Sequence, residues 1–259
     1  MSAMFAVQSL ARSHIGSVRS INEDRILNAS DRGLWAVADG MGGHAMGDVA
    51  ADIVVATLTN LVTTTEVLSL DAIKAALVTA NDNVRALSGN SGRQSGSTVA
   101  GLCLNRNEAI VFWAGDSRVY RSRAGELTLL THDHRLVQEM IDAGMIDAQQ
   151  ARSHPRATVI TRAIGASEML DLAAHVDEAQ DGDTYLICSD GLSDSIDSGQ
   201  LALALLGADD KVANELVRSA LAAGGTDNIS LIIVTLGTRE SAHLPVSGSS
   251  CATQFQGQI

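Results

Sequence analysis

Short apolar runs separated by turn residues recur along the chain, a pattern that is typical of β-strands. The runs that predict strands lie at 4–12, 33–39, 97–104, 109–115, 118–122, 183–189 and 228–236. Apolar residues also recur at helical spacing at 71–88 and near 212–221, which predicts amphipathic helices there. Further helices are expected at 46–62 and from Arg135 to Gly144, where the glycine would end the helix.

The order of these elements decides the expected fold class. Strands, a pair of helices, more strands, more helices and a last strand do not make a regular βα alternation. We therefore expect an α+β fold, with antiparallel sheet and helices packed outside, rather than a doubly wound parallel sheet. From Thr238 the periodicity stops and Ser, Gly and Gln become frequent, so we expect one domain at 1–237 and a flexible tail at 238–259.

Composition narrows the class of protein. With 259 residues, 46% of them hydrophobic, the chain can bury a full core. A formal net charge of −12 without any Lys/Arg run argues against nucleic acid and anionic membranes as partners. Three irregularly spaced cysteines make neither a disulfide framework nor a zinc motif, and no stretch predicts a signal peptide or a membrane span. We expect a cytoplasmic protein.

Aspartates mark the ends of predicted strands in segments that are far apart in sequence. Asp39 and Asp190 each follow an apolar run and precede a glycine. Asp116 ends another run, and Asp227 stands just before the last one. Any one of them alone is more often a turn or a cap. If the sheets bring all of them together, their like charges need protons or cations for neutralisation.

Oxygen ligands without a cysteine or histidine cluster suit Mg²⁺ or Mn²⁺. Two such ions bridged by a carboxylate can activate water and clamp a phosphoryl oxygen. The glycines after Asp39 would let a backbone carbonyl approach the metal and leave room for substrate. Arg19, which precedes the acidic pair Glu23 and Asp24, would supply a planar fork for the substrate phosphate.

An ordered series of motifs runs from about residue 5 to residue 236. The motifs are GSVRSINEDR (16–25), VADGMGGHAMG (37–47), GSTVAG (96–101), WAGDSRVYR (113–121), THDH (131–134), TRAIG (161–165), GDTYLICSDGLSD (182–194) and GGTDNISLIIV (224–234). Together they resemble the metal-dependent PP2C-type (PPM) Ser/Thr protein phosphatases in their short bacterial form. The resemblance implies a four-layer αββα sandwich, in which helices flank two antiparallel sheets and a dinuclear Mn²⁺/Mg²⁺ site lies at one end.

The resemblance also implies the ligands of the first ion. Asp39 would bridge the two ions, and Asp190 and Asp227 would complete the coordination of the first. These three aspartates, with Arg19, are the implied catalytic residues.

Ligands of further ions are implied by the same motifs. Gly40 would offer its carbonyl to the second ion, and Glu23 or Asp24 would act in or just outside its shell, mostly through waters. Bacterial members often bind a third, weaker ion, for which Asp116 and Asp190 match.

The implied reaction is hydrolysis of phosphoserine and phosphothreonine on proteins without a phosphoenzyme. A metal-bridging hydroxide would attack phosphorus in line, while the metals and Arg19 stabilise the developing charge. In animal members a histidine two residues after the bridging aspartate is the usual proton donor, but Met41 stands there in this chain. His44 is a candidate for handling substrate, and the alternative is a loop histidine with a local hydrogen bond.

The segment 132–165 corresponds to the family's flap, beside the active site. Its glycine and methionines are compatible with a mobile lid, and a helical hairpin packed on the core fits equally well. Both interpretations stay open.

Expected partners are phosphorylated proteins, including a cognate Ser/Thr kinase and its targets, and the protein is expected to be a monomer. A regulatory binding module that keeps the fold without activity is the competing interpretation. It is disfavoured because Arg19, Asp39, Asp190 and Asp227 are all present.

Overall fold

A computed structural model describes residues 5–42, 46–91 and 95–237 of the protein. The strands are β1 (Ala6–His14), β2 (Asp24–Ala29), β3 (Leu34–Met41), β4 (Gly96–Ser97), β5 (Val99–Asn105), β6 (Glu108–Ala114), β7 (Arg118–Arg123), β8 (Glu126–Leu129), β9 (Ala173–Glu178), β10 (Thr184–Cys188) and β11 (Ile229–Gly237). The helices are α1 (Gly47–Thr64), α2 (Leu70–Ser91), α3 (Leu136–Asp142), α4 (Ala148–Arg152), α5 (Asp190–Ser193), α6 (Ser198–Leu205) and α7 (Asp210–Ala222). Within the described ranges, none of these helices has both the length and the apolar character needed to cross a membrane.

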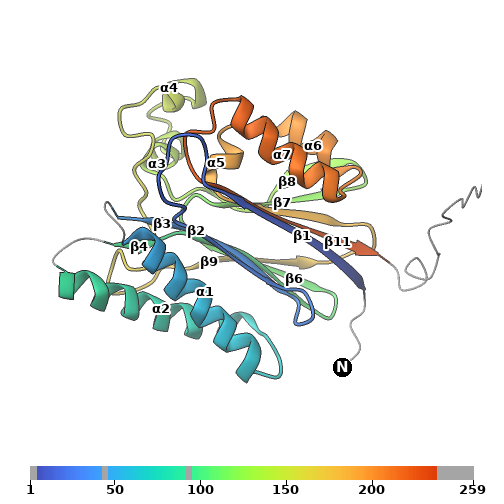
Figure 1. Cartoon of the computed structure of the whole chain (residues 1–259), viewed down its shortest axis with the longest axis horizontal. Helices are drawn as coiled ribbons and strands as arrows, with labels where there is room; N and C mark the ends of the chain where they lie inside the picture. Colours follow the sequence, from blue (N-terminus) through green and yellow to red (C-terminus); the bar gives the residue numbers. More distant parts are fainter. Residues whose placement is uncertain (1–4, 43–45, 92–94, 238–259) are drawn as a thin grey trace, which may run out of the picture.

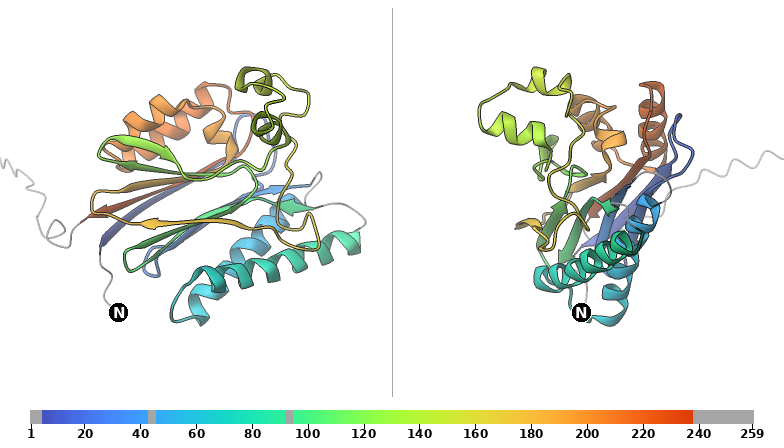
Figure 2. Two further views of the ribbon diagram at one scale, coloured as in Figure 1. Left: turned by 180° about the vertical axis from the view of Figure 1, so that it is seen from behind. Right: turned by 90° about the vertical axis from the view of Figure 1, so that its left-hand side faces the viewer.

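Two antiparallel sheets of the described residues lie face to face, and helices cover their outer faces (Figure 1). One sheet has the strand order β1-β11-β10-β7-β8, and the other has the order β2-β3-β5-β6-β9 with β4 paired to β3. Helices α1 and α2 cover the second sheet, and α6 and α7 cover the first (Figures 1 and 2). The expected α+β fold, a four-layer αββα sandwich, is confirmed.

Buried apolar residues form three clusters in the described ranges, one in each gap between layers. Strand β3 shows how the sequence fills two of them at once. Its Leu34 and Ala36 pack toward α1 and α2, whereas Trp35 and Val37 pack between the sheets. Because successive side chains of a strand point to opposite faces, a strand that is buried on both sides reads as an unbroken apolar run.

The predicted helices and strands are confirmed to within a few residues at their ends. Gly144, with φ +67°, follows α3 as the predicted terminating glycine. The sequence pattern missed the strands β2, β8 and β9 and the short helices α4, α5 and α6. Strand β9, at the edge of its sheet, carries the polar sequence AAHVDE and is largely exposed, so no hydrophobic alternation marks it.

The segment 132–165 forms a helical hairpin, α3 and α4, that stands at one end of the sandwich (Figures 1 and 2). Val137 and Ala151 are buried within it, but neither belongs to the three core clusters. Met145 is 72% exposed. A helical hairpin is therefore present, but its buried residues lie outside the three core clusters, so packing on the core is not shown. The lid interpretation concerns motion and stays a prediction.

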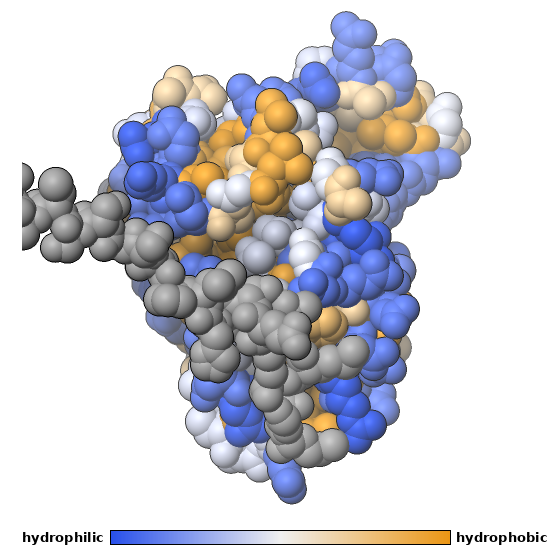
Figure 3. All heavy atoms as spheres, turned by 90° about the vertical axis from the view of Figure 1, so that its right-hand side faces the viewer, coloured by the Kyte–Doolittle hydropathy of each residue, from blue (hydrophilic) through white to orange (hydrophobic). Residues whose placement is uncertain are grey.

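Apolar side chains also reach the surface of the outer helical layer. Figure 3 shows them gathered on the upper part of the face that it presents, on the side of the sandwich covered by α6 and α7. Leu203 and Leu206, near the end of α6, are 72% and 62% exposed. The tail expected at 238–259 lies outside the described residues.

Candidate metal centre

The acidic residues singled out in the sequence meet at one end of the two sheets. The pKa of Asp39 is held well above its ordinary value, first by burial of its carboxyl group and then by the charges of other carboxylates. Those neighbours are, in order of effect, Asp24, Asp190, Asp116 and Asp227. Carboxylates from segments that are far apart in the sequence therefore lie close enough to raise one another's pKa.

Asp24 and Asp39 are direct cross-strand partners on β2 and β3. Asp24 is 3% exposed, and its Oδ2 accepts a hydrogen bond from Ser189 Oγ at 2.9 Å. Burial raises the pKa of Asp24 to about 6. Two carboxyl groups placed opposite each other in a sheet destabilise it when both are charged, so this pairing requires a proton or a cation.

The backbone around Asp39 is fixed by the GST motif. Thr98 N–H donates to the Asp39 carbonyl at 2.8 Å, and Thr98 Oγ1 accepts from Asp39 N–H at 3.1 Å. Ser97 Oγ also donates to the Asp39 carbonyl, at 3.2 Å. Both hydroxyls are buried, and they hold the backbone of the strand in place, which is a structural role.

Gly40 is a glycine because two backbone segments approach each other there. A Cβ on Gly40 would lie 2.0 Å from the carbonyl oxygen of Gly47 and 2.9 Å from that of Glu23. The Gly40 N–H donates to the Glu23 carbonyl at 3.2 Å. This close packing sets Glu23 and the start of α1 beside the strand that carries Asp39.

The second group of acids lies around an arginine. Asp116 is 2% exposed, and its Oδ2 accepts from Arg135 Nε at 2.5 Å. The Nη2 of Arg135 donates to Asp190 Oδ2 at 3.0 Å and to Asp194 Oδ2 at 2.9 Å. Burial, followed by the charge of Asp116, raises the pKa of Asp190 to about 7.

Asp227 and Arg19 form the third part of the centre. Arg19 Nη2 donates to Asp227 Oδ2 at 2.6 Å, and the Arg19 side chain remains 51% exposed. The next residue, Asn228, holds the loop that carries Arg19. Its Nδ2 donates to the carbonyls of Ile15 and Ile21 at 2.8 and 3.1 Å, and its Oδ1 accepts from Glu23 N–H at 2.8 Å.

These residues fit divalent metal ions by a direct observation. Asp24 Oδ1, Asp116 Oδ1 and Asp190 Oδ1 are buried oxygens that have no hydrogen-bond partner within the described ranges. Buried carboxylate oxygens are costly unless they are protonated, paired or bound to a cation. Among residues 5–42, 46–91 and 95–237, no three such side chains form a closed ligand set. Arg19 and Arg135 hold oxygens of Asp227, Asp116 and Asp190 instead.

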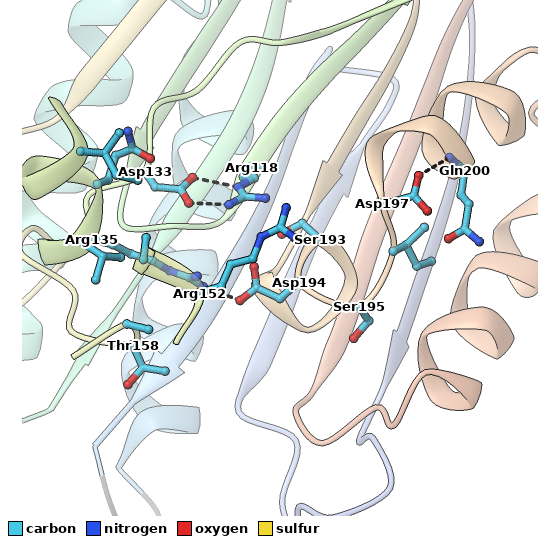
Figure 4. Close-up of a pocket in the computed structure, with 16 residues that line it drawn as sticks. Arg118, Asp133, Arg135, Arg152, Thr158, Ser193, Asp194, Ser195, Asp197 and Gln200 are labelled. Atoms are coloured by element: carbon cyan, nitrogen blue, oxygen red, sulfur yellow. Dashed lines mark hydrogen bonds and ion pairs between the residues drawn. The ribbon is translucent and has the colours of Figure 1, made fainter. Parts of the chain in front are cut away.

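A cavity of about 750 Å³ opens beside the centre, between the α3–α4 hairpin and the segment from α5 to α6. Figure 4 shows Arg135 and Asp194 in its wall. Both also belong to the cluster of charged residues around Asp116 and Asp190. Arg152, from α4, points toward Ser193 and Asp194 across this space. The hairpin therefore forms one wall of the space next to the candidate metal ligands.

The structure brings together all of the predicted site residues except His44, which lies outside the described residues. Sequence reasoning missed four contributors, namely Arg135, Ser189, Asp194 and Asn228. Ser189, Asp194 and Asn228 stand inside the motifs of the sequence analysis, so the motifs gave a signal for them. No pattern in the sequence indicates that the Arg135 side chain turns toward Asp116.

Comparisons with known proteins agree with this geometry. Residues 11–208 match the family described as protein phosphatase 2C. The Ser/Thr protein phosphatase PstP of Mycobacterium tuberculosis is 37% identical over 227 residues, which cover 86% of this chain and 44% of PstP. The chain thus spans less than half the length of that relative.

Solved structures match over nearly their whole length. One is described as PppA, a key regulatory component of T6SS in Pseudomonas aeruginosa; it is 39% identical, with a TM-score of 0.81, over 89% of this chain and 97% of that one. The catalytic domain of PstP in complex with two manganese ions is 33% identical, with a TM-score of 0.82, over 90% of this chain and 99% of that one.

Proposed function

Because the chain belongs to the protein phosphatase 2C family, we propose that it is a metal-dependent phosphatase that hydrolyses phosphoserine and phosphothreonine on proteins. The observation that carries the proposal is the convergence of mutually repelling carboxylates around Asp39, with Arg19 beside them. Manganese or magnesium suits such an all-oxygen set. The manganese ions of the PstP structure support the same choice.

The family resemblance of the motifs implies the ligands, and the positions of the carboxylates are compatible with it. Asp39, whose pKa is raised by the charges of four other aspartates, would be shared by two ions, and Asp190 and Asp227 would complete the first. The Gly40 carbonyl, with Glu23 and Asp24, would serve the second. Bound there, the ions supply Lewis-acid activation of water and neutralise charge on the phosphoryl oxygens.

Arg19 would bind and orient the substrate phosphate. One of its terminal nitrogens is held by Asp227, and half of the side chain is open to solvent, so other donors are available to phosphate oxygens. Asn228 and the Asp227 pairing hold the loop in place before substrate arrives, which limits the reorganisation needed for binding. The guanidinium would then stabilise the charge that develops on the phosphoryl group.

The described side chains offer no proton donor at the position that animal relatives use. Met41 has a thioether, which cannot donate a proton. His134, in the THDH motif, has its Nδ1 engaged as the acceptor of the Gly115 N–H at 3.1 Å. Burial lowers the pKa of His134 to about 4, so it is neutral near pH 7 and is a poor general acid. We infer that solvent supplies the proton to the leaving seryl or threonyl oxygen.

We propose that the protein acts as a cytoplasmic monomer. It would remove phosphate from the proteins that a Ser/Thr kinase phosphorylates. Cys103 and Cys188 are buried free thiols, which suits a reducing compartment. The names of the matched relatives support protein substrates as a class.

Hydrolysis of a phosphothreonine peptide by the purified chain tests this function. We expect activity with Mn²⁺ or Mg²⁺, no activity in EDTA, and collapse of activity in Asp39→Asn and Asp190→Asn. Glu108→Gln is the matched control, because this exposed acid lies at the opposite end of a strand from the centre. Activity that persists in EDTA would refute the mechanism, and metal binding without any turnover would favour a binding module.

A further inference from the structure

Arg135 is placed rigidly at the entrance to α3. Its backbone forms an isolated bridge with Ile160, and the flanking His134 N–H donates to the Gly115 carbonyl at 2.9 Å. Its carbonyl accepts from Gln138 and Glu139, the first turn of the helix. The side chain is only 11% exposed. The position of the guanidinium is therefore set by the fold and not by a flexible surface.

The guanidinium lies among three carboxylates that come from different elements. Asp116 follows β6, Asp190 begins α5 and Asp194 follows α5, and each presents its Oδ2 to Arg135 at 2.5, 3.0 and 2.9 Å respectively. An arginine keeps its charge under all ordinary conditions. It thus compensates part of the negative charge on this side of the centre without any bound ion.

Asp116 and Asp190 are the residues that match a third, weaker ion in bacterial relatives. An ion held by this pair would lie about 2.1 Å from an oxygen of each carboxylate. Arg135 occupies that space on the Oδ2 side, since its nitrogens already contact both Oδ2 atoms. The arrangement therefore does not fit a third ion between the Oδ2 atoms. Within the described ranges Asp116 Oδ1 and Asp190 Oδ1 stay without a hydrogen-bond partner, and the first ion would use the latter, so Asp116 Oδ1 alone remains for a further ion.

We propose that Arg135 is a resident cation that takes the place of a third divalent ion, so that this centre binds two metal ions and not three. The inference rests on the proposed metal centre but concerns the number of ions and not the reaction. Arg135 acts as a positioning residue in this proposal. It orients Asp190 for the first ion and fixes Asp116 and Asp194, which a third ion would otherwise hold.

The test counts manganese ions bound per 259-residue chain, by titration with detection of free Mn²⁺ by electron paramagnetic resonance. We expect two ions for the unmodified chain and three for Arg135→Ser, which frees the Oδ2 atoms. Arg135→Gln, which is shorter and keeps a hydrogen-bond donor without the charge, should also gain the third ion. The double variant Arg135→Ser with Asp116→Asn should return to two. Arg152→Ser is the control and should stay at two ions. This neighbouring arginine lines the same cavity, but among the described residues it forms no ion pair with these acids.

Three ions on the unmodified chain would overturn the proposal, as would two ions on a folded Arg135→Ser chain. Circular dichroism in the presence of Mn²⁺ checks that each variant is folded. The proposed function fails separately. It fails if the unmodified chain binds no manganese, or if Asp39→Asn leaves the count unchanged. Loss of ions in Asp39→Asn together with a count of three on the unmodified chain would keep the function and reject the role of Arg135.

Discussion

Asp24 and Asp39 are paired directly across β2 and β3, so the antiparallel sheet carries two carboxyl groups face to face at its functional end. Strand pairing normally avoids like charges in this position. The rest of β2 and β3 pairs in register from Arg25 and Ala38 to Ala29 and Leu34, and this pairing keeps the two acids in place. The fold therefore holds two carboxyl groups where they repel each other unless a proton or a cation neutralises them.

Substitution of Asp39 should raise the stability of the metal-free protein and at the same time remove its stabilisation by bound metal. Without metal, Asp39→Asn should be more stable than the unmodified chain, because burial and the neighbouring carboxylates disfavour the charged form of Asp39, and asparagine has no charge to lose. A gain of about 1 kcal/mol would raise Tm by about 2–4 °C. Added Mn²⁺ should raise the Tm of the unmodified chain but not of the variant. Melting curves in EDTA and in Mn²⁺ check this, with Asp52→Asn, an exposed partner of Arg25, as the control. A variant that melts lower in EDTA would contradict it.

Arg19→Lys should weaken catalysis without changing metal binding. A lysine keeps the charge but loses the planar fork, so kcat/KM should fall by about 10²-fold. Initial rates on a phosphopeptide, together with manganese titration, measure both quantities. Arg85→Lys, on the exposed side of α2, should leave both unchanged. Equal activity of Arg19→Lys and the unmodified chain would exclude the proposed phosphate contact.

Gly40→Ala tests the close backbone contact. The added Cβ would meet the Gly47 carbonyl at 2.0 Å, so either β3 or the start of α1 must move. We expect loss of activity and of Mn²⁺ affinity, and a loss of stability of a few kcal/mol, on the order of that for overpacking. Gly207→Ala is the matched control, because nothing lies within 4 Å of its added Cβ. Similar behaviour of the two variants would show that the contact is unimportant.

His134 should make the fold sensitive to mild acid. Burial lowers its pKa from 6.5 to about 4, so the folded state favours the neutral ring. This contribution to stability, about 3 kcal/mol at most, is complete above pH 6.5 and is lost as the pH falls toward 4. Arg162, Asp171, His132 and Asp133 are the charged groups that also influence the pKa of His134. Replacement of His134 by asparagine leaves all four in place.

Urea unfolding between pH 4 and 7.5 in EDTA measures this effect. His134→Asn keeps an acceptor for the Gly115 N–H, and its stability should fall less than that of the unmodified chain between pH 6.5 and 4. The carboxylates with raised pKa values act in the opposite direction but are common to both proteins. Parallel curves for the two proteins would show that His134 does not titrate as expected.

The pattern along the sequence predicted an α+β fold and pointed to four of the clustered aspartates, and the family resemblance of the motifs supplied the four layers. Strands such as β3 and β11 are buried on both faces and so leave long apolar runs, and Asp39 and Asp227 stand next to them. The edge strands β2 and β9 were missed because they are only partly covered, and their residues follow no apolar alternation.

Long-range side-chain contacts could not be predicted. Arg135 stands 55 positions before Asp190, and Asn228 stands more than 200 positions after the loop that it holds. Their partners are chosen by how the sheets and the α3–α4 hairpin pack. Periodicity and spacing carry no information on that packing, so the arginine among the acids becomes visible only in three dimensions.

The pairing of the first strand with the last sets when the centre can exist during protein synthesis. Strand β1 pairs along its length with β11, and Arg19 meets Asp227 across a separation of 208 positions. At 5–20 residues per second, a ribosome makes these two residues about 10–40 s apart. A nascent chain therefore carries an incomplete centre until its final strand has emerged and paired with β1.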